Sequence, residues 1–185
     1  MCIRDRLLGF GWAKPVPVNP ANYRNYRRDD LKVSLAGIAM NLLLFLAGFL
    51  AASVMVFIAI RPLGANYTTL IRYAVSLNPD FIAATLGQLP AYIYEMLVYF
   101  VYVNISLALF NLLPVPPLDG YHVVNDLLLR RSLFASEKSA RAAMGILFVL
   151  MITGLLGRGL SFAVDAVLGG AGWLTHGLFH LLGML

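Results

Sequence analysis

The sequence is short of cysteine and of charge. Its single cysteine, Cys2, excludes an internal disulfide and any Cys-x-x-Cys metal or redox motif. Charged residues make up 12% of the 185 residues and hydrophobic residues 60%, whereas soluble domains contain about 25% charged and about 45–50% apolar residues. No internal repeat or low-complexity segment is apparent. This composition excludes a typical soluble domain and indicates a membrane protein.

Long apolar runs define the expected membrane helices. Residues 33–60 contain no charge, and about 20 apolar residues span a bilayer, so this run predicts a transmembrane helix. It is too long and too far from the N-terminus to be a signal peptide. Residues 91–113 predict a second span, interrupted only by Glu95. Residues 142–185 predict one or two further membrane helices, and the part from Gly159 onward is compatible with a fourth span or an interfacial hairpin.

Basic residues give the expected orientation. They gather in residues 7–32 and 121–141, whereas only Arg61 and Arg72 lie between the first two spans. The positive-inside rule places both basic segments in the cytoplasm and makes residues 61–90 an extracytoplasmic connection. The net charge of +5 therefore reflects topology, and no nucleic-acid-binding module is recognisable. The compact core and the lack of organelle signals indicate a prokaryotic inner membrane.

Two helix starts are expected outside the first two spans. Asn78-Pro79-Asp80 is typical of the N-terminal cap of a short helix, which would run through Leu86. Ser136 or Ser139 is expected to open the helix that comes after the second basic segment.

The N-terminal region predicts an extended segment. Residues 1–6 do not match the rest of the chain in character and are interpreted as a cloning or assembly scar. Within residues 7–32, three prolines among residues 15–20 exclude a helix, and the alternation around them fits an edge strand that leads into a basic connector. The expected fold is an all-α membrane protein of three to four transmembrane helices, with a small extended or β segment at the cytoplasmic membrane face.

A proline-rich break comes directly after the second span. Residues 111–120 read Asn-Leu-Leu-Pro-Val-Pro-Pro-Leu-Asp-Gly, and the prolines of residues 114–120 prevent a regular helix. Irregular backbone at membrane depth persists only where it is buried in protein or lines a cavity. A carboxylate at that depth costs roughly 2.5–3.5 kcal/mol and usually has a partner or a function. The pattern predicts a polar cavity inside the protein, with Asp119 facing it.

Three segments of the sequence carry a family resemblance. Residues 11–20 read Gly-Trp-Ala-Lys-Pro-Val-Pro-Val-Asn-Pro, residues 34–41 read Ser-Leu-Ala-Gly-Ile-Ala-Met-Asn, and the third segment is the break at residues 111–120. In this order they resemble the site-2 protease family of intramembrane zinc metalloproteases. The third segment matches the family's Asn-x-x-Pro-x-Pro-x-Leu-Asp-Gly motif at every defined position. Ile38 departs from the family pattern, which usually has proline there.

The resemblance implies roles for particular residues. Asp119 would be the third ligand of a catalytic zinc ion (Zn²⁺), and Asn111 would help to stabilise the oxyanion during peptide-bond hydrolysis. Asn41, Gly37 and Gly120 would support this site. An extended segment beside the site would pair with the backbone of an unwound substrate, and it comprises Lys14, Pro15, Val16, Pro17 and Val18.

Part of the zinc chemistry is missing. The sequence contains no His-Glu-x-x-His, the motif that supplies two zinc ligands and a general base. We therefore expect a fragment that lacks its catalytic helix and does not hydrolyse peptides alone. Two weaker metal candidates are the pair His176 and His180, which share a helical face, and the group Asp119, His122 and Asp126. The alternatives are interfacial histidines near the terminus and a His122 that faces solvent or supports Asp119.

The expected function is that of the membrane core of an intramembrane zinc metalloendopeptidase. Its partners would be transmembrane or membrane-proximal protein segments, which it would cleave, and the lipid bilayer. A non-catalytic scaffold or binding relative of the same family is the alternative. A small transporter or channel with Asp119 in its permeation path is a third hypothesis, which the spacing of the proline-rich motif disfavours. Upstream sequence with or without His-Glu-x-x-His would separate the first two.

Overall fold

All regular secondary structure in the described part of the chain is helical. The computed structural model describes residues 25–63, 78–129, 134 and 136–182. Within these ranges the elements are α2 (Tyr26–Ile60), η2 (Arg61–Leu63), α4 (Pro79–Leu86), α5 (Gln88–Asn111), α6 (Asp119–Val123), the π-helical η3 (Val124–Leu129), α7 (Glu137–Ile152) and α8 (Leu155–Leu181). The predicted all-α class is confirmed. The predicted extended segment around residues 11–18 lies outside the described residues.

Helix α2 is longer than the apolar run that predicted it. It ends at Ile60, as expected, but it begins at Tyr26, ahead of the span predicted from residue 33. Asn25 caps it, because its side-chain oxygen accepts from the backbone N–H of Arg28 at 3.5 Å, while the carboxylate of Asp29 accepts from the backbone N–H of Asn25 at 3.1 Å. Asp29 in the first turn also complements the positive end of the helix dipole. Capping therefore starts the helix before the membrane run begins.

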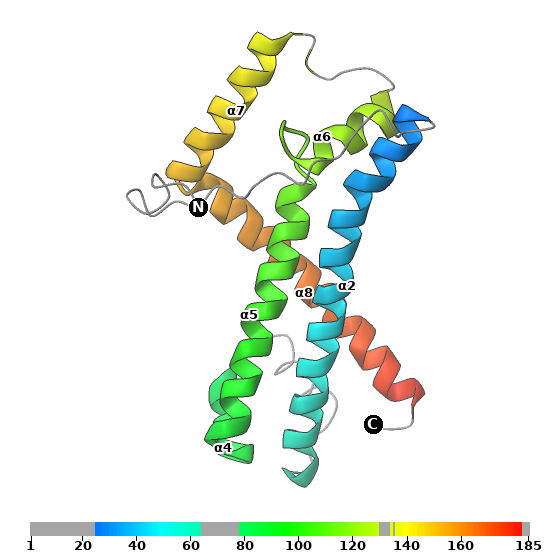
Figure 1. Cartoon of the computed structure of the whole chain (residues 1–185). Helices are drawn as coiled ribbons and strands as arrows, with labels where there is room; N and C mark the ends of the chain where they lie inside the picture. The colour runs from blue at the N-terminus through cyan, green and yellow to red at the C-terminus, as the bar shows by residue number, and fades with distance from the viewer. Residues whose placement is uncertain (1–24, 64–77, 130–133, 135, 183–185) are drawn as a thin grey trace, which may run out of the picture.

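Helices α4 and α5 follow each other closely, and α5 runs antiparallel to α2 (Figure 1). Asn78 caps α4 by accepting from the backbone N–H of Asp80 at 2.9 Å, and α4 ends at Leu86, so this part of the prediction is confirmed. Gly87 comes next with a φ of 93°, a left-handed backbone conformation that favours glycine. This residue separates α4 from α5, the second apolar helix.

The core lies where α2 packs against α5, and Figure 1 shows these two helices running side by side. A Cβ added at Gly48 would lie only 2.7 Å from Cδ1 of Phe100 and 3.2 Å from Cγ2 of Val101. Small residues permit such close packing of membrane helices, and Ala52, one turn further on, is 1% exposed. The buried core takes residues from α2, α4, α5 and α8: Phe45, Phe49, Val56, Ile60, Ile82, Tyr94, Val101, Ile105, Val164 and Leu168.

Helices α7 and α8 form a bent pair. Ser136 and Ser139 make a reciprocal capping box at the start of α7, as the sequence predicted. Gly154, with a φ of 71°, separates α7 from α8, and the pair is bent by 78°. Helix α8 then crosses behind α5 and α2 (Figure 1). Among the described helices, α2 and α5 can each cross a membrane and the bent pair can form a third span, against the three to four spans predicted.

Candidate functional site

The proline-rich break folds into a series of tight turns between α5 and α6. Helix α5 ends at Asn111, and residues 112–118 contain no helix. Their backbone is closed by short-range hydrogen bonds instead, including Val115 N–H to the Leu113 carbonyl at 2.8 Å and Leu118 N–H to the Val115 carbonyl at 2.9 Å. The sequence predicted this irregular backbone, since the prolines supply no N–H and clash with a continuing helix.

Gly120, the second residue of α6, packs closely against the backbone of this loop. It is buried, and a Cβ added there would collide with the carbonyl group of Leu112 and approach the carbonyl oxygen of Leu113 to 2.6 Å. Both neighbours are backbone, so they cannot move aside as the end of a side chain can. Only glycine fits this contact, which gives the predicted supporting role of Gly120 a steric basis.

Asp119 is the first residue of α6, and its carboxylate faces α2. The side chain is half-buried, and its Oδ2 atom lies 3.2 Å from the position that a Cβ of Gly37 would occupy. The missing side chain of Gly37 therefore makes room for the carboxylate. Burial raises the pKa of Asp119 above its usual value, and the nearby His122 ring lowers it by a smaller amount. The sequence named both Asp119 and Gly37, and the structure brings them together.

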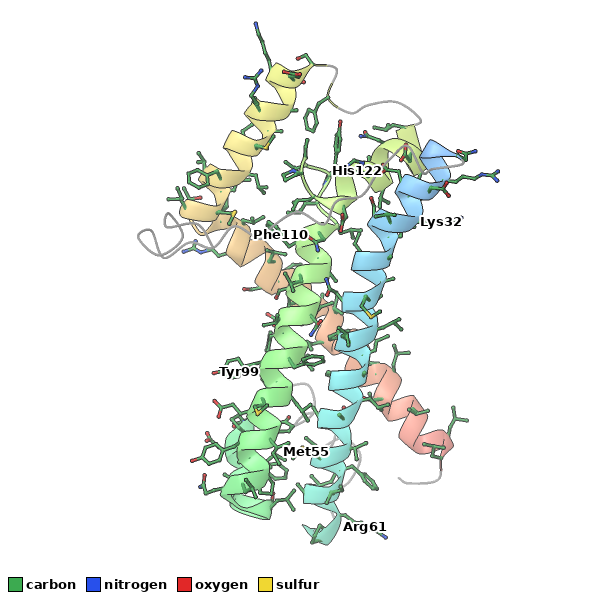
Figure 2. The ribbon with its side chains drawn as sticks, viewed as in Figure 1. Lys32, Met55, Arg61, Tyr99, Phe110 and His122 are labelled. Carbon is green, nitrogen blue, oxygen red and sulfur yellow. The ribbon has the colours of Figure 1, made fainter. Side chains whose placement is uncertain are left out.

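A second contact joins α6 to α2. The Nδ1 atom of His122 lies 2.8 Å from Oδ2 of Asp30, and the two side chains are 40% and 16% exposed. Figure 2 shows His122 at the end of the bundle where α2 begins, the same end as Lys32, while Arg61 marks the other end. Sequence reasoning missed Asp30, because it assigned residues before 33 to a connector. The signal available was the cap at Asn25, which extends α2 to include this carboxylate.

The two asparagines that the sequence predicted for the site make no hydrogen bond to Asp119. Asn41 lies one turn after Gly37 on the same face of α2, and Asn111 is the last residue of α5. Both are half-buried, and neither side chain hydrogen-bonds to another residue within the described ranges. Asn104 lies two turns before Asn111 and is 6% exposed. It donates to the Phe100 carbonyl at 2.8 Å, so its polarity is satisfied within α5.

The described residues offer one carboxylate to a metal and not a complete site. Hydrolytic zinc sites use three protein ligands and a water, and no three His, Cys, Asp or Glu side chains gather in the part of the chain that the structure describes. The predicted group of Asp119, His122 and Asp126 is therefore wrong, since His122 turns to Asp30 on α2. Half-burial and the space beside Gly37 suit Asp119 as one oxygen donor.

The remaining predicted residues lie elsewhere. His176 and His180 belong to the C-terminal part of α8, at the opposite end of the bundle from α6 (Figure 1). The side chain of His180 is exposed and is part of no metal-binding group among the described side chains, whereas the side chain of His176 is not among them. The segment that was predicted to pair with substrate lies outside the described residues, and it comprises Lys14, Pro15, Val16, Pro17 and Val18.

Fold and site together define a helical membrane protein that holds a half-buried carboxylate at the end of a proline-rich break. Residues 14–154 match a family model that is described as "Peptidase family M50". The chain therefore belongs to peptidase family M50, the site-2 protease family. It contains the motifs at residues 34–41 and 111–120 within the matched range.

A curated relative gives the same assignment. The chain is 31% identical over 144 residues to "Putative zinc metalloprotease YwhC" of Bacillus subtilis (strain 168). The match covers 76% of this chain and 55% of the relative, so the chain spans about half the length of the protein that it matches. No solved structure gives a significant match.

Proposed function

We propose that this chain is the membrane core of an intramembrane zinc metalloendopeptidase that cleaves transmembrane or membrane-proximal protein segments. The observation that carries the proposal is the placement of Asp119. Its carboxylate packs against Gly37 of α2. The proline-rich break before it packs closely against Gly120. Membership of peptidase family M50 and the zinc metalloprotease description of the Bacillus relative support the reaction type.

Residues of this chain would have three roles: they would ligate the zinc ion, bind the oxyanion and pair with the substrate backbone. Asp119 would supply one oxygen ligand, and its half-buried position would limit competition from water. When bound, zinc would polarise the scissile carbonyl and activate a water molecule. The amide of Asn111 would donate a hydrogen bond to the developing oxyanion. Residues 14–18 would hold the substrate backbone in an extended conformation by edge pairing, because a helical substrate must unwind before its amides can be attacked.

The remaining zinc ligands would come from a helix that this sequence does not contain. No His-Glu-x-x-His occurs in the 185 residues, so the chain by itself would supply at most one of the three protein ligands and would be inactive. The end of the bundle that carries Lys32 and His122 (Figure 2) would face the cytoplasm, because these residues belong to the two stretches of sequence that are rich in basic residues, 7–32 and 121–141. The host membrane would be a prokaryotic inner membrane.

The test supplies the missing helix in trans. The purified chain is mixed in detergent with a synthetic membrane helix that carries His-Glu-x-x-His, and zinc binding is measured by competition with a chromophoric chelator. We expect the mixture to bind one zinc ion per chain more tightly than either component. Asp119→Asn should weaken this binding by at least tenfold, whereas Asp80→Asn, at an exposed position on α4, should leave it unchanged.

The alternative is a non-catalytic scaffold of the same family. It predicts that the helix associates with the chain but that zinc affinity is the same with wild type and with Asp119→Asn. That result would remove Asp119 from the ligand set and favour the scaffold.

A further inference from the structure

A groove that is lined by both polar and apolar side chains lies between α5 and α8, away from the Asp119 region. Its volume is about 450 Å³. Helix α5 contributes hydroxyl groups and helix α8 contributes a carboxylate, a further hydroxyl and a glycine; these residues are Tyr102, Ser106, Gly157, Ser161 and Asp165. The rest of the lining is apolar. Neither the family motifs nor the zinc site account for this cluster.

The groove lies deep within the membrane-crossing part of the bundle. Tyr102 stands nine residues before Asn111, the end of α5, and a helix rises about 1.5 Å per residue. Ser106 stands only five residues before that end and lines the same groove. The groove therefore extends from about 8 to about 14 Å inside the end of α5, while the hydrocarbon core of a bilayer is about 30 Å thick. On α8, Asp165 falls within Leu155–Thr175, which together with α7 is apolar enough to form one bent span.

Asp165 carries a charge that the described residues do not balance. Its side chain is exposed at the surface of the bundle, and it makes no hydrogen bond or ion pair within the described ranges. Arg158, two turns earlier on α8, is also exposed and makes no ion pair with it. Tyr102 is close enough to interact with the carboxylate electrostatically. An ionisable residue at this depth is costly to leave unpaired and marks a functional site by default.

We propose that this groove docks a partner transmembrane helix that carries a lysine or arginine side chain near its middle. A lysine ammonium has three donors and no acceptor, which suits a groove that is lined by the Asp165 carboxylate and by the hydroxyl groups of Ser106 and Ser161. Gly157 and the two serines are small, so a second helix can approach closely. A lipid chain offers no donor, and lipid headgroups lie at the interface rather than at this depth. This docking does not depend on proteolysis by the chain.

The experiment uses designed membrane helices as probes. The full chain is reconstituted in phosphatidylcholine vesicles with dye-labelled polyleucine helices, and association is measured by energy transfer. One helix carries a central lysine, a second carries leucine there, a third carries glutamate there, and a fourth carries its lysine near one end. We expect the central-lysine helix to associate at least tenfold more tightly than the other three. A tighter complex with the end-lysine helix would assign the attraction to the interface and overturn the proposal.

Variants of the chain locate the binding. Asp165→Asn keeps the size of an exposed side chain, and it should abolish the preference for lysine over leucine. The double variant S106A/S161A should weaken it several-fold while the carboxylate remains. Phe162→Leu, at a position that is 78% exposed on the neighbouring face of α8, is the matched control and should keep the full preference. Equal association of the lysine and leucine helices with wild type, or an unchanged preference in Asp165→Asn, would refute the proposal.

Discussion

Replacing Gly37 with alanine tests the contact between α2 and the Asp119 carboxylate. The new methyl group would lie 3.2 Å from Oδ2 of Asp119, a crowded distance that requires one partner to shift by a few tenths of an ångström. Alanine is also the better helix former by about 0.8–1.0 kcal/mol. We expect the two effects to offset each other, so Gly37→Ala should change the free energy of unfolding by less than about 0.5 kcal/mol.

The assay is a double-mutant cycle in detergent micelles. The free energy of unfolding is measured by denaturant titration with circular dichroism, for Gly37→Ala in the wild-type chain and in an Asp119→Ala background. Removing the carboxylate removes the crowding, so in that background Gly37→Ala should stabilise by about 0.8–1.0 kcal/mol. The coupling energy between the two positions should be about 0.5–1 kcal/mol, within the range for residues in contact.

Gly145 provides the matched control. It lies within α7, and a Cβ added there would have no atom within 4 Å. Gly145→Ala should therefore stabilise by the full helix-propensity gain in both backgrounds. If Gly37→Ala and Gly145→Ala stabilise the wild-type chain equally, or if Gly37→Ala shows no coupling to position 119, then the carboxylate does not face α2 and the site as described is wrong.

The contacts of α6 and the charge pattern yield four further predictions. Gly120→Ala forces a methyl group against backbone and should cost about 1–3 kcal/mol of stability, read by the same unfolding assay. Burial raises the pKa of Asp119 in the folded chain. The stability that this carboxyl group contributes is therefore present below its unfolded pKa and is lost as the pH rises through its folded pKa. Asp119→Asn should remove that loss and raise the Tm of the zinc-free chain at neutral pH. Asp30→Asn should weaken the contact with α6 by about 1 kcal/mol and speed amide hydrogen exchange there. In spheroplasts of a bacterial host, with Cys2 replaced, Arg61→Cys should react with an impermeant thiol reagent and Ser136→Cys should not. The reverse labelling pattern would overturn the proposed orientation.

Local signals in the sequence predicted much of the fold. The end of α2, the Asn78 cap of α4, the serine cap of α7 and the irregular backbone before Asp119 each depend on a few neighbouring residues, and each is confirmed. The early start of α2 was hidden because hydropathy marks where a helix enters the membrane and not where its capping begins. A composition-based reading therefore shortened the helix.

Contacts between distant residues could not be predicted in this way. Asp30 and His122 are 92 positions apart, and nothing in either local sequence names the other. The bend between α7 and α8 is marked by Gly154, but its 78° angle depends on how α8 packs across α5 and α2. The cluster around Asp165 was overlooked for the same reason, since its hydroxyl groups come from a different helix. The resemblance to a known family named Gly37 and Gly120, and the structure supplied their steric reasons.

The length of α2 has a mechanical consequence. Its 35 residues extend about 52 Å, well beyond the roughly 30 Å of hydrocarbon, and the overhanging turns hold Asp30. A helix is a stiff rod, so a pull or twist applied ahead of Tyr26 reaches α6 with little loss. A segment that precedes this helix in the chain, or a partner that binds its protruding end, can therefore change the geometry around Asp119.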